Sequence, residues 1–274
     1  MLGQRIATAI ALLVLLALVL VSGSQLAFVI TLAVFFGAAC WEGLKLFKIF
    51  HPLPLALAGA IILLLILNNR TSVNPVTLSA LCVLIWALRF VPALKYGLPD
   101  AAGARGRLFT LVYMLALLGC FIAIAALFQR SGVYMISAMA IVWVADIGAY
   151  FAGRAFGMRK LAPHISPGKT WEGAVGGWVA VLLLAAISSQ IPAFSSTFAA
   201  QLLLHFGWML WVLLMSLMVA ASIVGDLFES MMKRRAGVKD SSRLLPGHGG
   251  VLDRIDALIP TMPLAVLLGA SLAL

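Results

Sequence analysis

Charged residues are scarce in this chain of 274 residues, and acidic residues are scarcer than basic ones. Only 10% of the residues are charged, against roughly 25% in an ordinary soluble domain. Hydrophobic residues make up 64% of the chain, and the mean hydropathy is +1.12. No polar segment between the apolar runs is long enough to form a separate domain. The composition therefore excludes a soluble globular protein and indicates a membrane protein.

Cysteine is also rare, with three residues in the whole chain. Cys40, Cys82 and Cys120 lie in different apolar runs, and their spacing fits neither a disulfide framework nor a metal site. We interpret them as small buried side chains. Tandem repeats and low-complexity linkers are missing too, so the sequence indicates one integral unit.

Apolar runs close to the ~20 residues that span a bilayer recur along the whole chain. They predict an all-α polytopic membrane protein with about nine transmembrane helices. The expected spans are 6–22, 25–41, 53–69, 76–93, 108–128, 133–152, 173–191, 201–224 and 257–274. We expect one integral membrane unit in which residues 1–105 form scaffold helices and residues 106–274 carry the functional region, whose polar residues concentrate at 222–256.

The basic residues predict the orientation, because cytoplasmic loops of membrane proteins collect Lys and Arg. With the N-terminus in the cytoplasm, all but two of the nineteen Lys and Arg residues fall on the cytoplasmic side. The two exceptions are Arg70 and Arg130. An odd number of spans then places the C-terminus in the periplasm. This distribution explains the net charge of +10 better than a nucleic-acid partner does.

The first apolar run leaves one alternative open. Arg5 precedes it and small residues, Ser22 to Ser24, follow it, which is also the pattern of a cleaved signal peptide. An uncleaved first helix is the simpler interpretation, because the run is long for a signal peptide and eight further spans follow.

Carboxylates in or beside apolar helices are costly and point to a function. Asp146 lies late in the sixth span, where we expect it to face a polar cavity. The alternatives are an interhelical hydrogen bond and an ion pair with Arg154. Asp226 and Glu229 end the eighth span and share a helix face with Ser222 and Ser230.

A second acidic pair, Asp253 and Asp256, precedes the ninth span. Two such pairs can meet across a hairpin and offer the oxygen ligands that Mg²⁺ prefers. A solvated acidic cap is the alternative.

Between the acidic pairs lies a glycine-rich turn, residues 246–250, with Lys and Arg before it. Glycines let the backbone approach an anion closely. Together with the basic residues and the acids, the turn predicts phosphate recognition, whereas an anchor to anionic lipid would explain the basic residues alone. His248 could be a ligand, an acid or base, or a residue that stabilises the turn. The basic residues are Lys233, Arg234, Arg235, Lys239 and Arg243.

A second polar loop, residues 159–173, contains Gly168, Lys169 and Thr170. A phosphate-binding Walker loop would need glycine at position 163, where the chain has Pro163, and a preceding strand. We therefore reject that motif. Lys169 remains a candidate phosphate contact, and Glu172 is expected to begin the next helix.

The segment from Ser230 to Asp256 resembles the signature of the phosphatidate cytidylyltransferases, or CDP-diacylglycerol synthases. Segments 146–157 and 166–173 are similar to that family as well. The positions that carry the resemblance are Ser230, Lys233, Arg234, Lys239, Asp240, Ser242, Leu245, Pro246, His248, Gly249, Gly250, Asp253, Arg254 and Asp256.

The resemblance implies synthesis of CDP-diacylglycerol and pyrophosphate from CTP and phosphatidic acid, at the cytoplasmic face of a bacterial inner membrane. It implies Mg²⁺ dependence, with K⁺ as a second candidate ion, and places metal ligands at Asp226 and Asp253. Asp256 and Glu229 are then auxiliary ligands, and Lys239 acts with the acids in catalysis. Membrane lipids and a homodimeric partner are compatible with it. The expected substrate contacts are Asp146, Lys169, Ser230, Lys233, Arg234, Arg243, His248, Gly249, Gly250 and Arg254.

Two other classes compete with this interpretation. An ion-coupled transporter should place its polar residues near the membrane midplane, often in related halves, but here they cluster toward one face. A CDP-alcohol phosphatidyltransferase, another enzyme of phospholipid synthesis, should carry an Asp-Gly-x₂-Ala-Arg sequence, which is absent.

Overall fold

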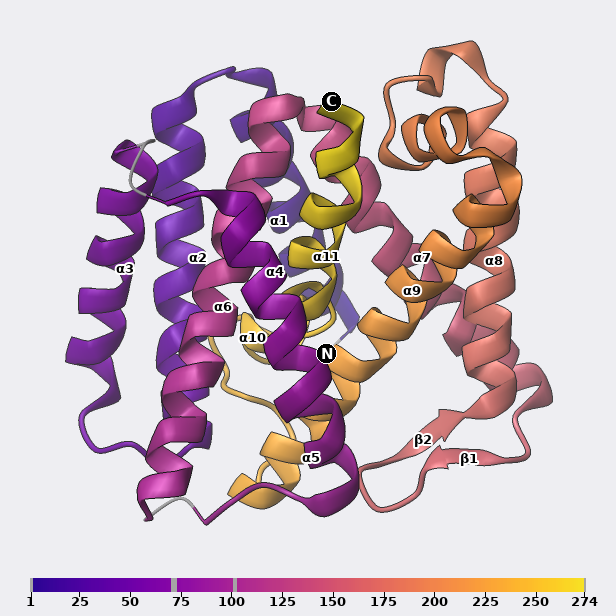
Figure 1. The fold of residues 1–274 in the computed structure, drawn as a ribbon. Coiled ribbons are helices and arrows are strands. Elements are labelled where there is room, and N and C mark those ends of the chain that lie inside the picture. Colours follow the sequence, from indigo (N-terminus) through magenta and orange to yellow (C-terminus); the bar gives the residue numbers. More distant parts are fainter. Residues whose placement is uncertain (1, 70–72, 101–102, 274) are drawn as a thin grey trace.

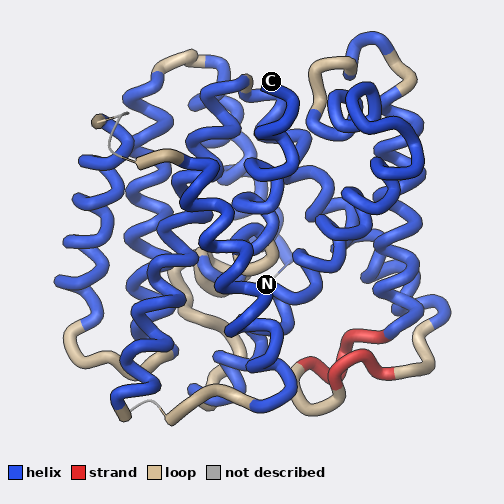
Figure 2. The backbone as a smooth tube through the Cα atoms, viewed as in Figure 1, coloured by secondary structure: helices blue, strands red, loops and turns tan. Residues whose placement is uncertain are grey.

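The structure, a computed structural model, describes residues 2–69, 73–100 and 103–273. Arg70, which we expected on the periplasmic side, lies outside them. The described chain is a bundle of helices with one small β-hairpin (Figure 1). Most loops lie at the two ends of the bundle, whereas the loop that precedes α10 runs toward its middle, and the hairpin lies at the end opposite the C-terminus (Figure 2).

The N-terminal part is entirely helical where it is described. Its elements are α1 (Leu2–Val21), α2 (Gln25–Leu46), α3 (Pro52–Asn68), α4 (Pro75–Ile85), the π-helical turn η1 (Trp86–Phe90) and α5 (Val91–Tyr96).

The C-terminal part contains longer helices and the hairpin. Its elements are α6 (Ala104–Arg130), α7 (Gly132–Phe156), β1 (Lys160–Ala162), β2 (Ser166–Thr170), α8 (Trp171–Ser189), the 3₁₀ turn η2 (Pro192–Phe194), α9 (Phe198–Ala236), α10 (Leu252–Ile255), α11 (Leu258–Ala270) and the 3₁₀ turn η3 (Ser271–Ala273).

Local sequence signals explain where several helices begin. Ser24, Asn74, Ser131 and Thr170 each accept a hydrogen bond from a backbone N–H in the first turn that follows, at 2.9–3.2 Å. Such caps satisfy amide groups that have no partner inside the helix. Thr170 also ends β2, so one residue joins the hairpin to α8.

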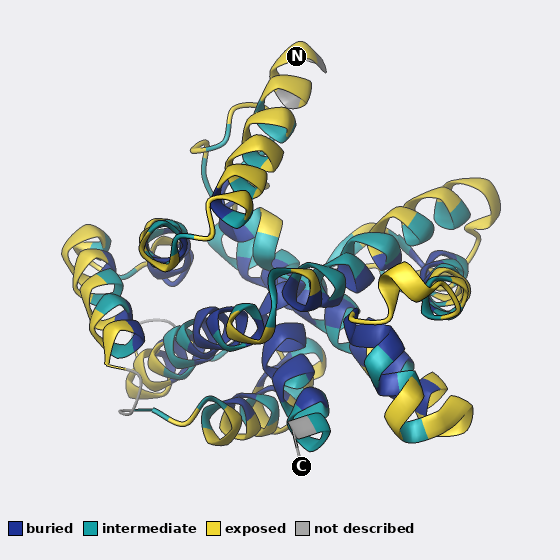
Figure 3. Cartoon of the chain, turned by 90° about the horizontal axis from the view of Figure 1, so that it is seen from above, coloured by how far each residue is buried: buried dark blue, intermediate teal, exposed yellow. Residues whose placement is uncertain are grey.

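The short helix α11 lies in the middle of the bundle, where it contacts α4, α6, α7 and α9. Seen from above, burial is concentrated where the helices meet, and their outward faces are exposed (Figure 3). Those outward faces carry large apolar side chains, such as Leu18, Leu65 and Leu183. An apolar outer surface is what lipid contact requires, so the pattern fits a protein embedded in a bilayer.

Helices α7 and α8 pack closely through small residues. A Cβ atom added at Gly176 would lie 2.1 Å from the Cβ of Ala152, and one at Gly177 would lie 2.4 Å from the backbone oxygen of Ala145. Small residues let helix backbones approach closely in membranes, where the lipid supplies no hydrophobic force to bring them together. This contact holds α8, and with it the hairpin, against α7.

The structure confirms that the expected apolar segments form helices. A helix lies at each of the nine expected positions among the described residues, and six of these helical segments are long and apolar enough to cross a bilayer. The apolar stretch Ile6–Val21 of α1 is shorter, as are α3 and α11. The fold is therefore that of an all-α membrane protein.

Two features differ from the expectation. Segment 160–170 forms an antiparallel hairpin instead of an irregular loop, because Lys160 pairs with Thr170 and Ala162 with Ser166. The eighth span is interrupted at Gly207, whose φ of +69° breaks the helix. It then continues to Ala236, so Asp226 and Glu229 lie within the helix rather than at its end.

We expect Gly176→Val to destabilise the α7–α8 contact by about 1–3 kcal/mol, because the added side chain would overlap Ala152. Thermal unfolding of the purified protein in detergent measures the effect. Gly3→Ala is the control, since nothing lies within 4 Å of a Cβ at that position. Equal melting temperatures for the two variants would contradict the close packing.

Candidate active site

A cavity of about 680 Å³ opens where α7, α8, α9, β2 and the loop from α9 to α10 meet. Its charged lining carries both signs. The acidic residues are Asp146, Asp226, Asp240, Asp253 and Asp256, and the basic residues are Arg154, Lys169, Lys233 and Arg254. A concave site with converging charges of both signs suits an anionic ligand that binds together with a cation.

Asp226 on α9 faces the hairpin. Its Oδ2 forms an ion pair with the ammonium group of Lys169 on β2, and its Oδ1 accepts a longer hydrogen bond (3.4 Å) from the hydroxyl of Ser230. The side chains of Lys169 and Asp226 are each 27% exposed, so both remain accessible from the cavity. The two segments that the sequence singled out, 159–173 and 222–256, therefore meet at this pair.

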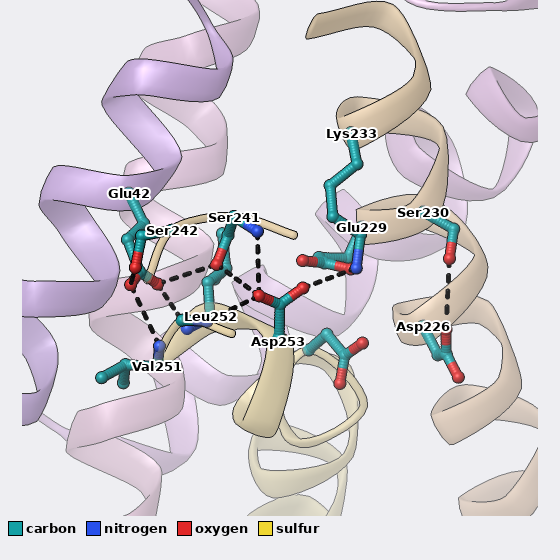
Figure 4. A network of polar contacts seen from close by, with 12 residues as sticks. Glu42, Asp226, Glu229, Ser230, Lys233, Ser241, Ser242, Val251, Leu252 and Asp253 are labelled. Atoms are coloured by element: carbon teal, nitrogen blue, oxygen red, sulfur yellow. Dashed lines mark hydrogen bonds and ion pairs between the residues drawn. The ribbon is translucent and has the colours of Figure 1, made fainter. Parts of the chain in front are cut away.

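Lys233, two helical turns after Asp226, joins α9 to α10. Its Nζ lies 2.5 Å from Glu229 Oε2 and donates to Asp253 Oδ1 at 2.6 Å (Figure 4). The side chain of Glu229 is only 1% exposed. A buried charge is stable only when it is paired, so this lysine compensates for the burial of two carboxylates.

Asp253 is held by the loop that precedes it. Its Oδ2 accepts hydrogen bonds of 2.8 Å from the backbone N–H of Ser241, the hydroxyl of Ser241 and the backbone N–H of Gly250. Burial alone would raise the pKa of Asp253, but the bonds from Lys233, Gly250 and Ser241 outweigh it and lower the pKa to about 2. Asp253 is therefore a fixed carboxylate at neutral pH.

Asp256 follows α10 and comes close to α9 because a glycine faces it. A Cβ at Gly225 would lie 2.5 Å from the backbone oxygen of Asp256, so only glycine permits this approach. Burial and the nearby charge of Asp226 raise the pKa of Asp256 well above its usual range. A cation between Asp226 and Asp256 would relieve that repulsion.

The donor atoms of the cavity suit a hard cation. Asp146, Asp226, Asp253 and Asp256 offer carboxylate oxygens to one space, and lysine ammonium groups already lie against Asp226 and Asp253. Mg²⁺ prefers oxygen ligands and usually takes one or two carboxylates together with substrate phosphates. Among the described residues, no three acidic, His or Cys side chains converge into a preformed metal site, so these aspartates fit such an ion together with substrate oxygens. The guanidinium of Arg154 donates to the hydroxyl of Tyr150 (3.2 Å) and not to Asp146. The carboxylate of Asp146 can therefore serve as a ligand of the ion.

The residues expected at the site divide into two groups. Asp146, Lys169, Asp226, Lys233, Asp253, Arg254 and Asp256 line the cavity. Glu229, Ser230, Arg234, Lys239, Arg243, His248, Gly249 and Gly250 are not among its lining residues.

The second group contains residues that shape or flank the cavity. Arg234 Nε donates weakly (3.4 Å) to the backbone oxygen of Ile165 in the hairpin turn. Lys239 and Arg243 are exposed. The backbone N–H of His248 donates to the oxygen of Leu245 (2.8 Å), within the tight turn of the loop.

Sequence reasoning missed Glu42 on α2, a carboxylate that is fully buried. Its Oε1 accepts from Ser242 Oγ (2.5 Å) and Val251 N (3.0 Å), and its Oε2 from Ser241 Oγ (3.1 Å) and Leu252 N (2.6 Å) (Figure 4). The signal was available, since an acid beside an apolar span is itself a reason to expect a function.

Comparisons with known proteins identify the family of the chain. A model of the cytidylyltransferase family matches residues 3–272. The phosphatidate cytidylyltransferase of Pseudomonas aeruginosa is 41% identical over 279 residues, which cover 99% of this chain and 98% of that protein.

Two other relatives match over a shorter stretch. The phosphatidate cytidylyltransferase of Haemophilus influenzae is 52% identical over 123 residues, which are 45% of this chain and 41% of that protein. That of Bacillus subtilis is 43% identical over 144 residues, which are 52% of this chain and 49% of the relative. In these two matches the chain spans less than half of the relative's length.

We expect Lys233→Met to lower the free energy of unfolding by about 3–5 kcal/mol, because it leaves buried Glu229 without its cation. Adding Glu229→Gln to this variant should recover part of the loss, since no unpaired buried charge then remains at position 229. Thermal unfolding in detergent measures both, with Lys239→Met as the control at an exposed lysine. A double variant no more stable than Lys233→Met would argue against the ion pair.

Proposed function

The chain belongs to the cytidylyltransferase family, and from this membership we propose that it makes CDP-diacylglycerol and pyrophosphate from CTP and phosphatidic acid. The observation that carries the proposal is the match to the P. aeruginosa enzyme along 99% of the chain. The charges of the cavity support it, because both substrates are anionic. Family membership also sets aside the transporter and the CDP-alcohol phosphatidyltransferase as alternatives.

The proposed reaction needs no covalent intermediate on the protein. A phosphate oxygen of phosphatidic acid attacks the α-phosphorus of CTP, a new P–O bond forms, and the bond to the β-phosphate oxygen breaks to release pyrophosphate. Positioning and electrostatic stabilisation dominate such transfers. Lys169, Lys233 and Arg254 line the cavity and would neutralise the phosphates as negative charge builds up on the leaving group. Arg154 adds a further cation to the same wall.

We propose that Mg²⁺ is bound by Asp226 and Asp253, with Asp256 as an auxiliary ligand and K⁺ as a second candidate ion. Mg²⁺ would bring the phosphate oxygens together and neutralise their charge. Asp146 faces the same space and completes the acidic wall. Glu229 contacts Lys233 and does not line the cavity, so its proposed part is to hold that lysine against Asp253.

The exposed basic residues have a separate proposed part. Lys239, Arg234 and Arg243 lie outside the cavity lining, on or beside the loop that borders it. We propose that they attract CTP and the lipid phosphate toward the opening. His248, Gly249 and Gly250 would then act by shaping the loop, and Ser230 by orienting Asp226.

We further propose nine membrane spans, with the N-terminus cytoplasmic, the C-terminus periplasmic and the cavity at the cytoplasmic face of the bacterial inner membrane. The helices at all nine expected positions support this arrangement, as does the concentration of Lys and Arg in the expected cytoplasmic segments. Membrane lipid surrounds the apolar outer faces, which also leave room for a homodimer.

Pyrophosphate release from CTP by the purified protein in detergent tests the function, with and without phosphatidic acid and Mg²⁺. We expect release only when the lipid and the ion are both present. We expect Asp226→Asn to slow it by at least about 10²-fold, by analogy with the loss of one electrostatic stabiliser. Asp100→Asn, which changes an acid outside the cavity lining, is the matched control. A rate in Asp226→Asn within a few-fold of the control would remove this aspartate from the mechanism.

The proposed orientation predicts opposite labelling at the two ends of α8. In a variant whose three cysteines are replaced by alanine, His164→Cys places a thiol in the exposed hairpin turn, and Ser195→Cys places one in the exposed turn after α8. An impermeant maleimide should label position 195 in intact spheroplasts and position 164 only after lysis. Labelling of position 164 in intact spheroplasts would reverse the proposed orientation.

A further inference from the structure

Glu42 is a carboxylate from the scaffold part of the chain whose hydrogen-bond donors all come from the signature. It lies on α2, fully buried, and its four donors belong to residues 241–252. Among the described residues, no Lys or Arg forms an ion pair with it. Hydrogen bonds from these donors, two of them at 2.5 and 2.6 Å, therefore compensate for the burial of its carboxyl group.

The contacts of Glu42 adjoin those of Asp253. Leu252, whose N–H donates to Glu42, is the residue before Asp253. The hydroxyl of Ser241 lies 3.1 Å from Glu42 Oε2 and 2.8 Å from Asp253 Oδ2, and its N–H donates to Asp253. One hydroxyl proton serves only one acceptor at a time, so Ser241 is shared between the two carboxylates. The position of Glu42 thus sets where the Asp253 carboxylate can lie.

Glu42 also explains a glycine of the signature. A Cβ at Gly250 would lie 2.4 Å from Glu42 Oε1 and 2.1 Å from the hydroxyl of Ser241. Gly250 is buried and is not among the residues that line the cavity. Its missing side chain makes room for the carboxylate from α2, while its N–H donates to Asp253. The close approach at this glycine is to a protein group.

We propose that Glu42 is a positioning residue for the transferase reaction, holding residues 241–252 so that Asp253 and Arg254 are correctly placed in the cavity. The inference rests on the function proposed above. Glu42 does not line the cavity, so it acts through the loop and not on substrate. A carboxylate is required because all four of its partners are donors. The amide of Gln would present its own N–H groups to two of them.

Glu42→Gln tests the proposal by three measurements on the full-length protein in detergent. We expect faster amide hydrogen exchange confined to peptides from 241–255, since Val251 and Leu252 donate to different oxygens of Glu42 and one of them loses its acceptor. We also expect a kcat about 10-fold to 100-fold lower, and a rise of similar size in the Mg²⁺ concentration that gives half the maximal rate, as when a group that orients a metal ligand is lost. Simple destabilisation would leave the Mg²⁺ dependence unchanged.

Two variants make the test specific. Lys45→Gln removes a charge from an exposed position of the same helix and should match the wild type in all three measurements. Ser242→Ala removes one of the four donors and should produce a smaller change in the same direction, without global unfolding. If Glu42→Gln does not fold, the measurements on Ser242→Ala test the role of Glu42 instead.

The outcomes separate the two proposals. Exchange and Mg²⁺ dependence like those of the wild type in Glu42→Gln, or in Ser242→Ala if the former does not fold, would overturn the role of Glu42. Faster exchange with unchanged kcat and Mg²⁺ dependence would reduce Glu42 to a structural anchor and also overturn it. If the wild type releases no pyrophosphate in response to the lipid, the proposed function is rejected. The exchange measurement would still show whether Glu42 holds residues 241–252 in place.

Discussion

The ammonium group of Lys233 is the interaction on which the rest of the site depends. It lies between Glu229, one turn earlier on α9, and Asp253, at the start of α10. Removing these charges from water would cost several kcal/mol for each ion if they were unpaired. The loop from α9 to α10 must therefore fold back so that Asp253 reaches the lysine. Lys169 and Asp226 repeat the arrangement on the hairpin side, so α9 connects both walls of the cavity.

The sequence predicts the parts of this protein whose signal is local. The apolar runs predict where the helices lie. Carboxylates are rare in apolar surroundings, so Asp146, Asp226 and Asp253 can be identified from the sequence as candidate site residues. The sequence does not predict partners brought together by tertiary packing. Glu42 is some 200 residues from Ser242 along the chain, and no periodicity connects them. The hairpin and the break at Gly207 were also missed, because apolar periodicity does not report them.

The proposed reaction places opposite demands on the cavity. Phosphatidic acid stays in the bilayer and CTP stays in water, so the phosphates must meet at the level of the lipid headgroups. The cavity combines these environments, since the apolar helices α7 and α8 form one wall and the polar segment 240–256 forms another. The small residues between α7 and α8 let the two helices of the first wall pack closely. The hairpin then brings Lys169 to the edge of the membrane helices.

The hydrogen bonds of Glu42 have a consequence for how this chain can be divided. A fragment that begins at residue 106 would contain the whole signature, every charged residue that lines the cavity and all four donors to the carboxylate. It would lack the acceptor, and the four donors, three of them on buried residues, would face an empty position. The signature segment therefore cannot be transferred to another chain without a matching acceptor at the position of Glu42. A chimera that exchanges the C-terminal part between relatives has to match the second helix as well.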